Sequence, residues 1–233
     1  MTNITLLNGC AIECLSNMLA ASLDAVITDP PYSSGGSQRK ATASKPSCKY
    51  TDNKSTLPDF HGETMDQLSL MHFTNLWMQA AYNALVPSGI MAAFIDWRNI
   101  AVTDFALQSA GFRKQGILVW DKTEGVRPRR GAFRQQAEFI IWGVKGSLDV
   151  SGPILPGLYR HSNIMRDKKH LTQKPLDLMK WLCGIKPAGA TICDPFMGSG
   201  TTCIAARELK QSFIGIERHT DIFATTEQRL CER

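Results

Sequence analysis

The sequence predicts a doubly wound α/β fold with a mostly parallel sheet and helices on both faces. Near-continuous apolar stretches recur from one end of the chain to the other, as is typical of strands buried on both faces. Segments with helical spacing of apolar residues alternate with them. The 233 residues, 43% of them hydrophobic, suffice for one sizeable core and predict a single domain.

Seven stretches predict the strands, and β-branched residues are common in them. In chain order they are residues 4–9, 24–29, 89–96, 114–122, 137–146, 190–195 and 212–217. Between them, apolar residues at helical spacing predict a helix over 65–85, which Pro87 and Gly89 would end, and further helices over 172–185 and 201–210. Residues 33–60 and 147–172 show no period. Long aperiodic connections in a compact domain are usually functional.

Charge and cysteine content restrict the class of protein. The net charge of +5 favours a polyanionic partner only mildly, because many enzymes are equally basic. Seven scattered cysteines without a C-x-x-C pair predict reduced thiols in a cytosolic protein. The chain starts without a signal-peptide pattern and contains no apolar run of membrane-spanning length, so we expect no membrane association and a cytoplasmic location.

The stretch Asp29-Pro30-Pro31-Tyr32 directly follows a predicted buried strand. Prolines fix φ and donate no hydrogen bond, so this corner is stiff and its carbonyl groups have fixed directions. An acid and an aromatic ring on a stiff corner favour a binding or catalytic site. The alternative is structural, with Asp29 capping a turn and Tyr32 packing.

A glycine-rich turn near the C-terminus predicts a second part of the same site. The strand ending at Asp194 leads into Gly198-Ser199-Gly200, after which a helix starts near Thr201. Glycines let a ligand approach the backbone, and the amides at a helix start favour an anionic group. Glu217 follows about 20 residues later, a position suited to ribose hydroxyls. A purely structural turn is the alternative, because the dinucleotide fingerprint G-x-G-x-x-G is absent.

Together, "DPPY" and "DPFMGSGTT" resemble the S-adenosylmethionine-dependent amino-methyltransferases that modify exocyclic amines of DNA bases. "NGCAIECL", "QAEFIIWGVKG" and "HLTQKPLDLMKWL" resemble further family segments, so the resemblance covers most of the chain. The catalytic half precedes the cofactor half, as in the family's β group. The resemblance implies a Rossmann-like methyltransferase fold with a seven-stranded sheet. It divides the domain into a catalytic and target half (1–146), a short target-recognition segment (147–169) and a cofactor half (170–233).

The resemblance also implies roles for individual residues. Asp29, Pro30, Pro31 and Tyr32 match the catalytic motif, and S-adenosylmethionine would be held by Lys174, Asp194, Phe196, Gly198, Ser199, Gly200, Thr201 and Glu217. One position departs from the family pattern: Cys10 stands where an acid is common. No Cys, His or carboxylate cluster has metal-ligand spacing, so we expect no metal.

The chemistry of an exocyclic amine explains why such residues are needed. Its lone pair is delocalised into the ring, so the nitrogen must become more tetrahedral to attack the sulfonium methyl group. The Asp29 carboxylate and the Pro30 carbonyl would each accept one N–H, which directs the lone pair and stabilises positive charge. Tyr32 would stack on a flipped-out base. In the β group, an acid at the first motif position implies adenine N6 more often than cytosine N4.

Three basic stretches predict contacts with the phosphates of double-stranded DNA. They contain Arg39 and Lys40; Arg127, Arg129, Arg130 and Arg134; and Arg166 and Lys168. The short recognition segment favours a short or relaxed target sequence.

We therefore expect a DNA adenine-N6 methyltransferase of restriction–modification type, from a bacterium or a phage. Family members often form homodimers, which makes a dimer possible. The alternatives are a cytosine-N4 DNA methyltransferase, an RNA adenine methyltransferase, a non-catalytic DNA-binding relative and, more remotely, a nicotinamide oxidoreductase.

Overall fold

The computed structural model describes residues 2–32, 65–126, 128–162 and 174–231. The predicted DNA contacts Arg39, Lys40, Arg127, Arg166 and Lys168 lie outside these residues. Among the described residues no helix combines the length and apolarity needed to cross a membrane, and the six described cysteines are unbridged.

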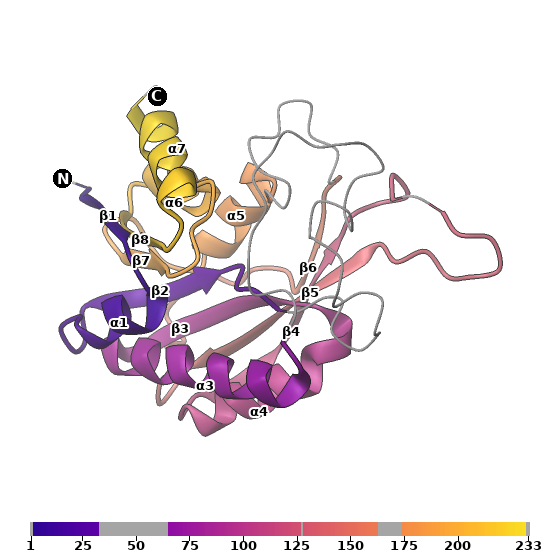
Figure 1. Ribbon diagram of the computed structural model, residues 1–233, viewed down its shortest axis with the longest axis horizontal. Coiled ribbons are helices and arrows are strands. Elements are labelled where there is room, and N and C mark those ends of the chain that lie inside the picture. The colour runs from indigo at the N-terminus through magenta and orange to yellow at the C-terminus, as the bar shows by residue number, and fades with distance from the viewer. Residues whose placement is uncertain (1, 33–64, 127, 163–173, 232–233) are drawn as a thin grey trace.

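An eight-stranded sheet runs through the described part of the chain in the order β1-β8-β7-β2-β3-β5-β4-β6 (Figure 1). Only β5 runs against its neighbours β3 and β4; every other pairing is parallel. The strands are β1 (Ile4–Asn8), β2 (Leu23–Thr28), β3 (Leu85–Ile95), β4 (Arg113–Asp121), β5 (Ala137–Val144), β6 (Leu158–Arg160), β7 (Thr191–Asp194) and β8 (Ser212–Glu217). The predicted α/β class is confirmed.

The predicted number of seven strands is wrong by one. The additional strand, β6, has three residues and pairs with the end of β4 through Leu158 and Val119. It lies inside the stretch 147–172, where no period is visible. Three residues are too few to produce a recognisable alternation, so hydrophobic patterning could not find this strand.

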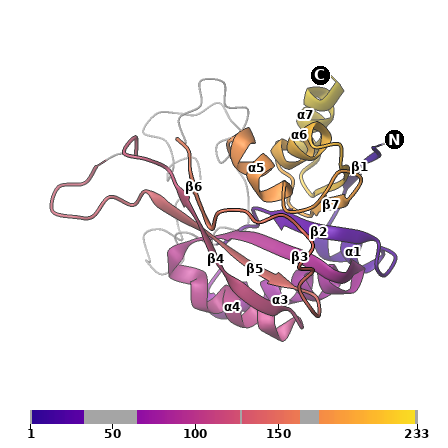
Figure 2. The same cartoon turned by 180° about the vertical axis from the view of Figure 1, so that it is seen from behind.

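Helices cover both faces of the sheet, as Figures 1 and 2 show from opposite sides. One face carries α1 (Ala11–Ser16), α3 (Gln67–Ala84) and α4 (Ile100–Ser109), and Leu15, Trp77 and Leu107 from these helices share one core cluster. The other face carries α5 (Leu176–Cys183), α6 (Thr201–Glu208) and α7 (Thr220–Cys231). There Leu178 and Cys203 belong to a second cluster, against which Phe223 packs. The helices on both faces are therefore confirmed.

The boundary between α3 and β3 differs from the expected one. Asp66 caps the start of α3 by accepting hydrogen bonds from the amides of Leu68 and Ser69. The helix ends at Ala84, and β3 follows at Leu85 without a loop. Pro87 thus lies within a strand, where the register against β2 shifts and Ser88 has a φ of 63°. A bulge is one of the few strand positions that accept proline.

The neighbouring strands β2 and β7 form the point at which the sheet changes winding direction. From β2 the chain continues to β3 on one side, and from β7 it continues to β8 on the other. The residues following both strands, Asp29 and Pro195, therefore leave the sheet at the same edge. In open α/β sheets ligands bind in the crevice at such a switch point.

Candidate active site

The Asp29–Tyr32 corner begins where β2 ends and is tied to the end of the neighbouring strand β3. After β3 comes a single 3₁₀ turn, Trp97–Asn99. Asn99 is buried, and its side-chain Nδ2 donates a 2.6 Å hydrogen bond to the backbone carbonyl of Tyr32. The stiff corner predicted from its two prolines is thus also held from outside by an asparagine that the sequence analysis did not single out.

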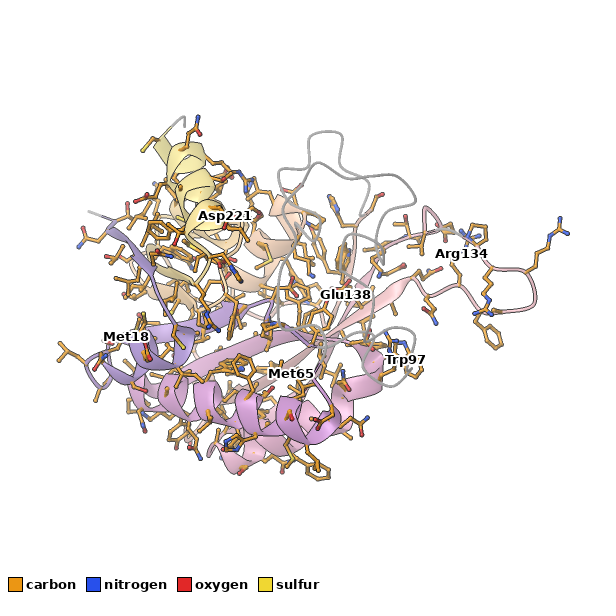
Figure 3. The ribbon with its side chains drawn as sticks, in the orientation of Figure 1. Met18, Met65, Trp97, Arg134, Glu138 and Asp221 are labelled. Atoms are coloured by element: carbon orange, nitrogen blue, oxygen red, sulfur yellow. The ribbon has the colours of Figure 1, made fainter. Side chains whose placement is uncertain are left out.

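Three charged side chains from distant parts of the sequence meet at this corner. The Lys174 ammonium lies 2.7 Å from Oδ2 of Asp29 and 2.9 Å from Oε1 of Glu138, at the start of β5. Lys174 is 8% exposed, and its Nζ lies 4.7 Å from the centre of the Phe94 ring. Glu138 lies centrally between the two helix layers (Figure 3). We refer to Asp29, Lys174 and Glu138 as the charge triad.

Burial and mutual attraction set the ionisation of the charge triad. Burial raises the pKa of Asp29 to about 6, although the Lys174 ammonium lowers it; Glu138 adds a smaller increase. Burial would also raise the pKa of Glu138, but Lys174 and Lys122 outweigh it and hold that pKa below its usual value. Burial would lower the pKa of Lys174, yet the two carboxylates raise it well above normal. At neutral pH all three groups are therefore charged.

The glycine-rich turn is organised from beneath by Asp194 at the end of β7. One carboxylate oxygen accepts hydrogen bonds from the Thr28 hydroxyl at 2.6 Å and the Phe196 amide at 3.1 Å, and the other accepts one from the Thr202 hydroxyl. Burial raises the pKa of Asp194 to about 6, while the bonds from Thr202 and Thr28 lower it. Asp194 thereby joins β2 to the start of α6, next to the Asp29–Tyr32 corner.

Glu217 and the C-terminal helix fix the turn from its other sides. The Glu217 carboxylate, at the end of β8, accepts hydrogen bonds from the amides of Gly198 at 3.1 Å and His219 at 2.8 Å. From α7, the Thr226 hydroxyl donates to the Gly198 carbonyl at 2.6 Å, and Arg229 donates to the Ser199 carbonyl. The conformation of the turn therefore depends on a helix that lies some thirty residues further along the chain.

The two glycines of the turn have different surroundings. Both have a positive φ, 49° at Gly198 and 74° at Gly200. A Cβ atom added to Gly198 would meet nothing within 4 Å, whereas one on Gly200 would lie 2.6 Å from the Thr226 methyl group. Gly200 is thus required by the packing of α7, and the open side of the turn is at Gly198.

Besides Oε1 of Glu138, which forms the ion pair with Lys174, two buried oxygen atoms at the site have no hydrogen-bond partner among the described residues. They are Oδ1 of Asp29 and Oγ1 of Thr201, at the start of α6. Buried polar atoms are rarely left unpaired, so both indicate places where a ligand supplies the partner. Together with the open space at Gly198, they show that the residues of this crevice fit a polar ligand such as a nucleoside cofactor.

Phe196 packs on the opposite side of the turn. Its ring lies 5.4 Å from that of Trp77, edge to face, and 6.0 Å from that of Phe73, both on α3. Such pairs are favourable aromatic geometries. The ring is half-buried, so one part anchors the turn to α3 while the remainder stays accessible.

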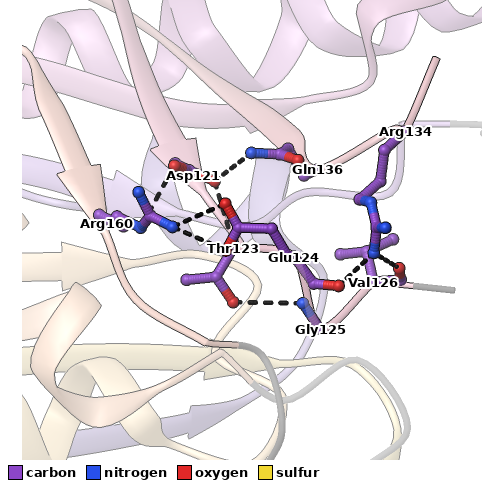
Figure 4. A network of polar contacts seen from close by, with 8 residues as sticks. All are labelled: Asp121, Thr123, Glu124, Gly125, Val126, Arg134, Gln136 and Arg160. Atoms are coloured by element: carbon purple, nitrogen blue, oxygen red, sulfur yellow. Dashed lines mark hydrogen bonds and ion pairs between the residues drawn. The ribbon is translucent and has the colours of Figure 1, made fainter. Parts of the chain in front are cut away.

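A long arm joins β4 to β5 and leaves the sheet at the same edge as the Asp29–Tyr32 corner (Figures 1 and 2). This β4–β5 arm comprises residues 122–136, of which 127 is not described. Figure 4 shows its base: Asp121 accepts hydrogen bonds from the Thr123 amide and the Gln136 side chain, and Arg160 on β6 pairs with Glu124 at 2.7 Å. The short strand β6 therefore helps to fix the base of the arm.

The arm carries three of the predicted DNA contacts. Arg129 and Arg130 are exposed. Phe133, which lies on the arm between these arginines and β5, is 100% exposed. Arg134 is also exposed, but its guanidinium donates hydrogen bonds to the carbonyls of Glu124 and Val126 (Figures 3 and 4). A fully exposed phenylalanine among arginines has the composition of a nucleic-acid contact.

The structure brings the predicted catalytic and cofactor residues to one edge of the sheet. Besides Asn99, sequence reasoning missed two features there. Lys174, expected at the cofactor, contacts the carboxylate of Asp29. Glu138 was not singled out, although its sequence "AEFIIWGV" places a charge at the start of an otherwise apolar strand, which is an available signal. No group of three or more potential metal ligands occurs among the described residues.

Comparison with known proteins places this arrangement in a family. The model of the N6_N4_Mtase family, described as DNA methylase, matches residues 23–151 and 154–228. The type II methyltransferase M.HpaI from Haemophilus parainfluenzae is 25% identical over 248 residues, covering 94% of this chain and 72% of that protein.

Two solved structures are also similar. The crystal structure of the M1.HpyAVI–SAM complex has a TM-score of 0.70 and 27% identity, covering 97% of this chain and 98% of the other. The cytosine-N4-specific PvuII DNA methyltransferase shares the fold, with a TM-score of 0.74 at 16% identity over 98% of this chain and 86% of its own. Because the family model matches most of the sequence, this chain belongs to the N6/N4 DNA methylase family.

Proposed function

We propose that this chain is a DNA adenine-N6 methyltransferase whose catalytic group is Asp29. The observation that carries the proposal is Oδ1 of Asp29, which is buried at the switch point beside the glycine-rich turn and has no hydrogen-bond partner in the described part of the chain. A carboxylate oxygen without a partner among the described residues is suited to accept a hydrogen bond from the amine of a target base.

S-adenosylmethionine is the methyl donor, and its sulfonium supplies an electrophilic methyl group. For its binding we propose the residues of the glycine-rich turn, Gly198, Ser199 and Gly200, with Phe196 against the sugar or base. Thr201 offers a hydroxyl to which no described residue is hydrogen-bonded, and Glu217 offers the lone pairs that the amides of Gly198 and His219 leave unused. Asp194 supports this binding from behind, because its oxygens are engaged within the protein.

In the proposed mechanism, residues of the catalytic corner orient and deprotonate the amine. Oδ1 of Asp29 and the carbonyl of Pro30 each accept one N–H, so that the nitrogen lone pair points at the methyl carbon. The N–C bond forms as the C–S bond breaks, and the electron pair of the broken bond stays on sulfur. Asp29, or a water beside it, takes the surplus proton from nitrogen. Tyr32, held through its carbonyl by Asn99, stacks on the flipped-out base.

Adenine is proposed over cytosine because an aspartate occupies the first position of the catalytic motif. The similarity to the cytosine-N4-specific PvuII enzyme extends to the fold alone. Cytosine N4 is therefore the second candidate for the target, and the test below distinguishes it from adenine N6. The similarity to a type II methyltransferase supports a role beside a restriction enzyme.

DNA contacts are proposed for the β4–β5 arm and for the segment 147–169, which would read the target. The arm leaves the sheet at the edge where the catalytic corner lies, so a duplex bound along it would present a flipped base to Asp29. Arg129 and Arg130 would contact phosphates.

The test is nucleoside mass spectrometry of unmethylated DNA incubated with S-adenosylmethionine and either wild type or Asp29→Ala. We expect N6-methyladenine from wild type and at least a ~100-fold loss in the variant. N4-methylcytosine would keep the mechanism and contradict the choice of base. An RNA substrate in parallel tests the RNA alternative, and absence of product on both substrates despite cofactor binding would overturn the proposal.

A further inference from the structure

We propose that Lys174 and Glu138 are positioning residues for Asp29: Lys174 holds one carboxylate oxygen so that the other faces the target amine, and Glu138 cancels the charge that Lys174 brings to the site. This inference rests on the proposed function, because it assigns a task to residues around the same catalytic carboxylate.

The geometry of the charge triad carries the first half of the inference. Lys174 Nζ donates to Oδ2 of Asp29 at 2.7 Å, while Oδ1 has no partner among the described residues. The Asp29 side chain as a whole is 21% exposed, although Oδ1 itself is buried. A carboxylate held on one oxygen by a buried ammonium cannot rotate freely, and its remaining lone pairs keep a fixed direction.

The second half follows from electrostatics. The target nitrogen gains positive charge as the methyl group is transferred, and an ammonium a few ångströms away would repel it. The Glu138 carboxylate, 2.9 Å from Lys174 Nζ, gives the charge triad a net charge of −1. Like charges at such distances disfavour each other strongly in a partly buried site. Without Glu138, Lys174 would orient Asp29 but oppose the reaction.

Other charged groups face the charge triad from the described residues around it. Lys122 lies 3.4 Å from the second oxygen of Glu138, on the side away from Lys174, and is 19% exposed. Asp194 adds a small effect that raises the pKa of Asp29, and the Tyr32 ring lies 5.9 Å from Lys174 Nζ. Lys122 therefore weakens the contribution of Glu138 but does not touch Asp29.

The inference predicts opposite pH shifts in two variants. Lys174→Gln removes the cation that favours ionised Asp29, so the acid limb of the pH–rate profile should move to higher pH by roughly one pH unit or more. Glu138→Gln removes an anion, so the acid limb should move to lower pH while the rate on the plateau falls. A residue with a merely structural role would lower the rate without moving the limb in either direction.

The experiment measures the rate of single-turnover methylation of unmethylated DNA against pH for wild type, Lys174→Gln, Glu138→Gln and Lys174→Arg. Because Lys174→Arg keeps the positive charge, the acid limb of its pH–rate profile should lie where the wild-type limb lies. In parallel, calorimetry measures the dissociation constant of S-adenosylhomocysteine, which for each variant should stay within about two-fold of the wild-type value. The matched control is Glu208→Gln, which breaks an exposed ion pair with Lys180 away from the site and should leave the profile unchanged.

Two outcomes would overturn the inference. If Lys174→Gln weakens S-adenosylhomocysteine binding and leaves the acid limb in place, Lys174 is a cofactor ligand. If both variants shift the limb in the same direction, Glu138 does not balance Lys174. Should wild type methylate neither DNA nor RNA, the proposed function fails on its own, and carboxyl ¹³C NMR titration of Asp29 in the same variants still tests the opposite shifts.

Discussion

At the residue scale, substitutions of the two glycines of the turn should have different effects: one should lower stability and the other should weaken ligand binding. Gly200→Ala adds a Cβ atom 2.6 Å from the Thr226 methyl group, at a φ of 74°. We expect it to lower the free energy of unfolding by about 2–4 kcal/mol, combining backbone strain and overpacking. In a Thr226→Ser background, which keeps the hydroxyl and removes the methyl group, the loss should be smaller. Urea denaturation measures both values.

Gly198→Ala is the matched substitution, because its Cβ atom would meet no protein atom. Its stability cost should be limited to about 1 kcal/mol of strain. Affinity for S-adenosylhomocysteine, measured by calorimetry, should fall at least about ten-fold, since the added methyl group occupies the open side of the turn. Unchanged affinity would place the cofactor elsewhere.

Asp29 also determines how stability varies with pH. Burial raises its pKa in the folded state from the usual 3.8 to about 6, so the folded protein holds this proton more tightly than the unfolded chain. The associated stability is complete below about pH 4 and is lost as the pH rises through 6. Asp29→Asn should therefore be more stable than wild type at pH 8, by roughly 1–3 kcal/mol. The difference should disappear towards pH 4, which chemical denaturation at several pH values would show.

At the element scale, the β4–β5 arm is predicted to supply DNA affinity without taking part in the reaction. Substituting Arg129 and Arg130 together by alanine should weaken DNA binding and lower the slope of log affinity against log salt by about 2. Single-turnover methylation at saturating DNA should keep its rate. Fluorescence anisotropy at several salt concentrations measures the slope. Arg113→Ala is the control, because Arg113 starts β4 at the opposite edge of the sheet.

Phe133 on the same arm offers a complementary measurement. It is fully exposed, so Phe133→Ala should leave the free energy of unfolding unchanged. Loss of stacking on DNA should lower affinity by about 1–3 kcal/mol without altering the salt slope. A change in slope instead would mean that the substitution displaces the arginines.

The elements also show what the sequence could and could not predict. Strands such as β3 and β5 contain continuous apolar runs, residues 90–95 and 139–142, whose length suffices to locate them. The strand β6 and the contact between Asn99 and Tyr32 depend on tertiary pairing between segments far apart in the chain. The same holds for Lys174: its motif indicates a functional residue, but only the folded sheet shows that Asp29 and Glu138 lie on either side of it.

At the scale of the whole molecule, the first strand and the last helix lie together at one edge of the sheet. β1 pairs in parallel with β8, register Ile4 to Phe213, and α7 packs beside them, so both termini lie on the same side of the molecule (Figure 1). The test is a circular permutant in which a Gly/Ser linker of about ten residues joins the termini, and the new ends lie in the exposed loop between Ser147 and Leu148. We expect this permutant to fold. Circular dichroism and the methylation assay would show whether it keeps a cooperative transition and activity. Loss of folding would indicate that the pairing of β1 must form before the rest of the sheet.

The pairing of β1 with β8 has a consequence for how genes of this kind can change. Since α7 adjoins β1 and the candidate site lies at the ends of β2 and β7, a tandem gene duplication followed by trimming at both ends could exchange the order of the two halves. Every intermediate gene product would still contain one complete copy of the sheet. The order of the halves along the chain can thus vary during descent while the arrangement around Asp29 is retained.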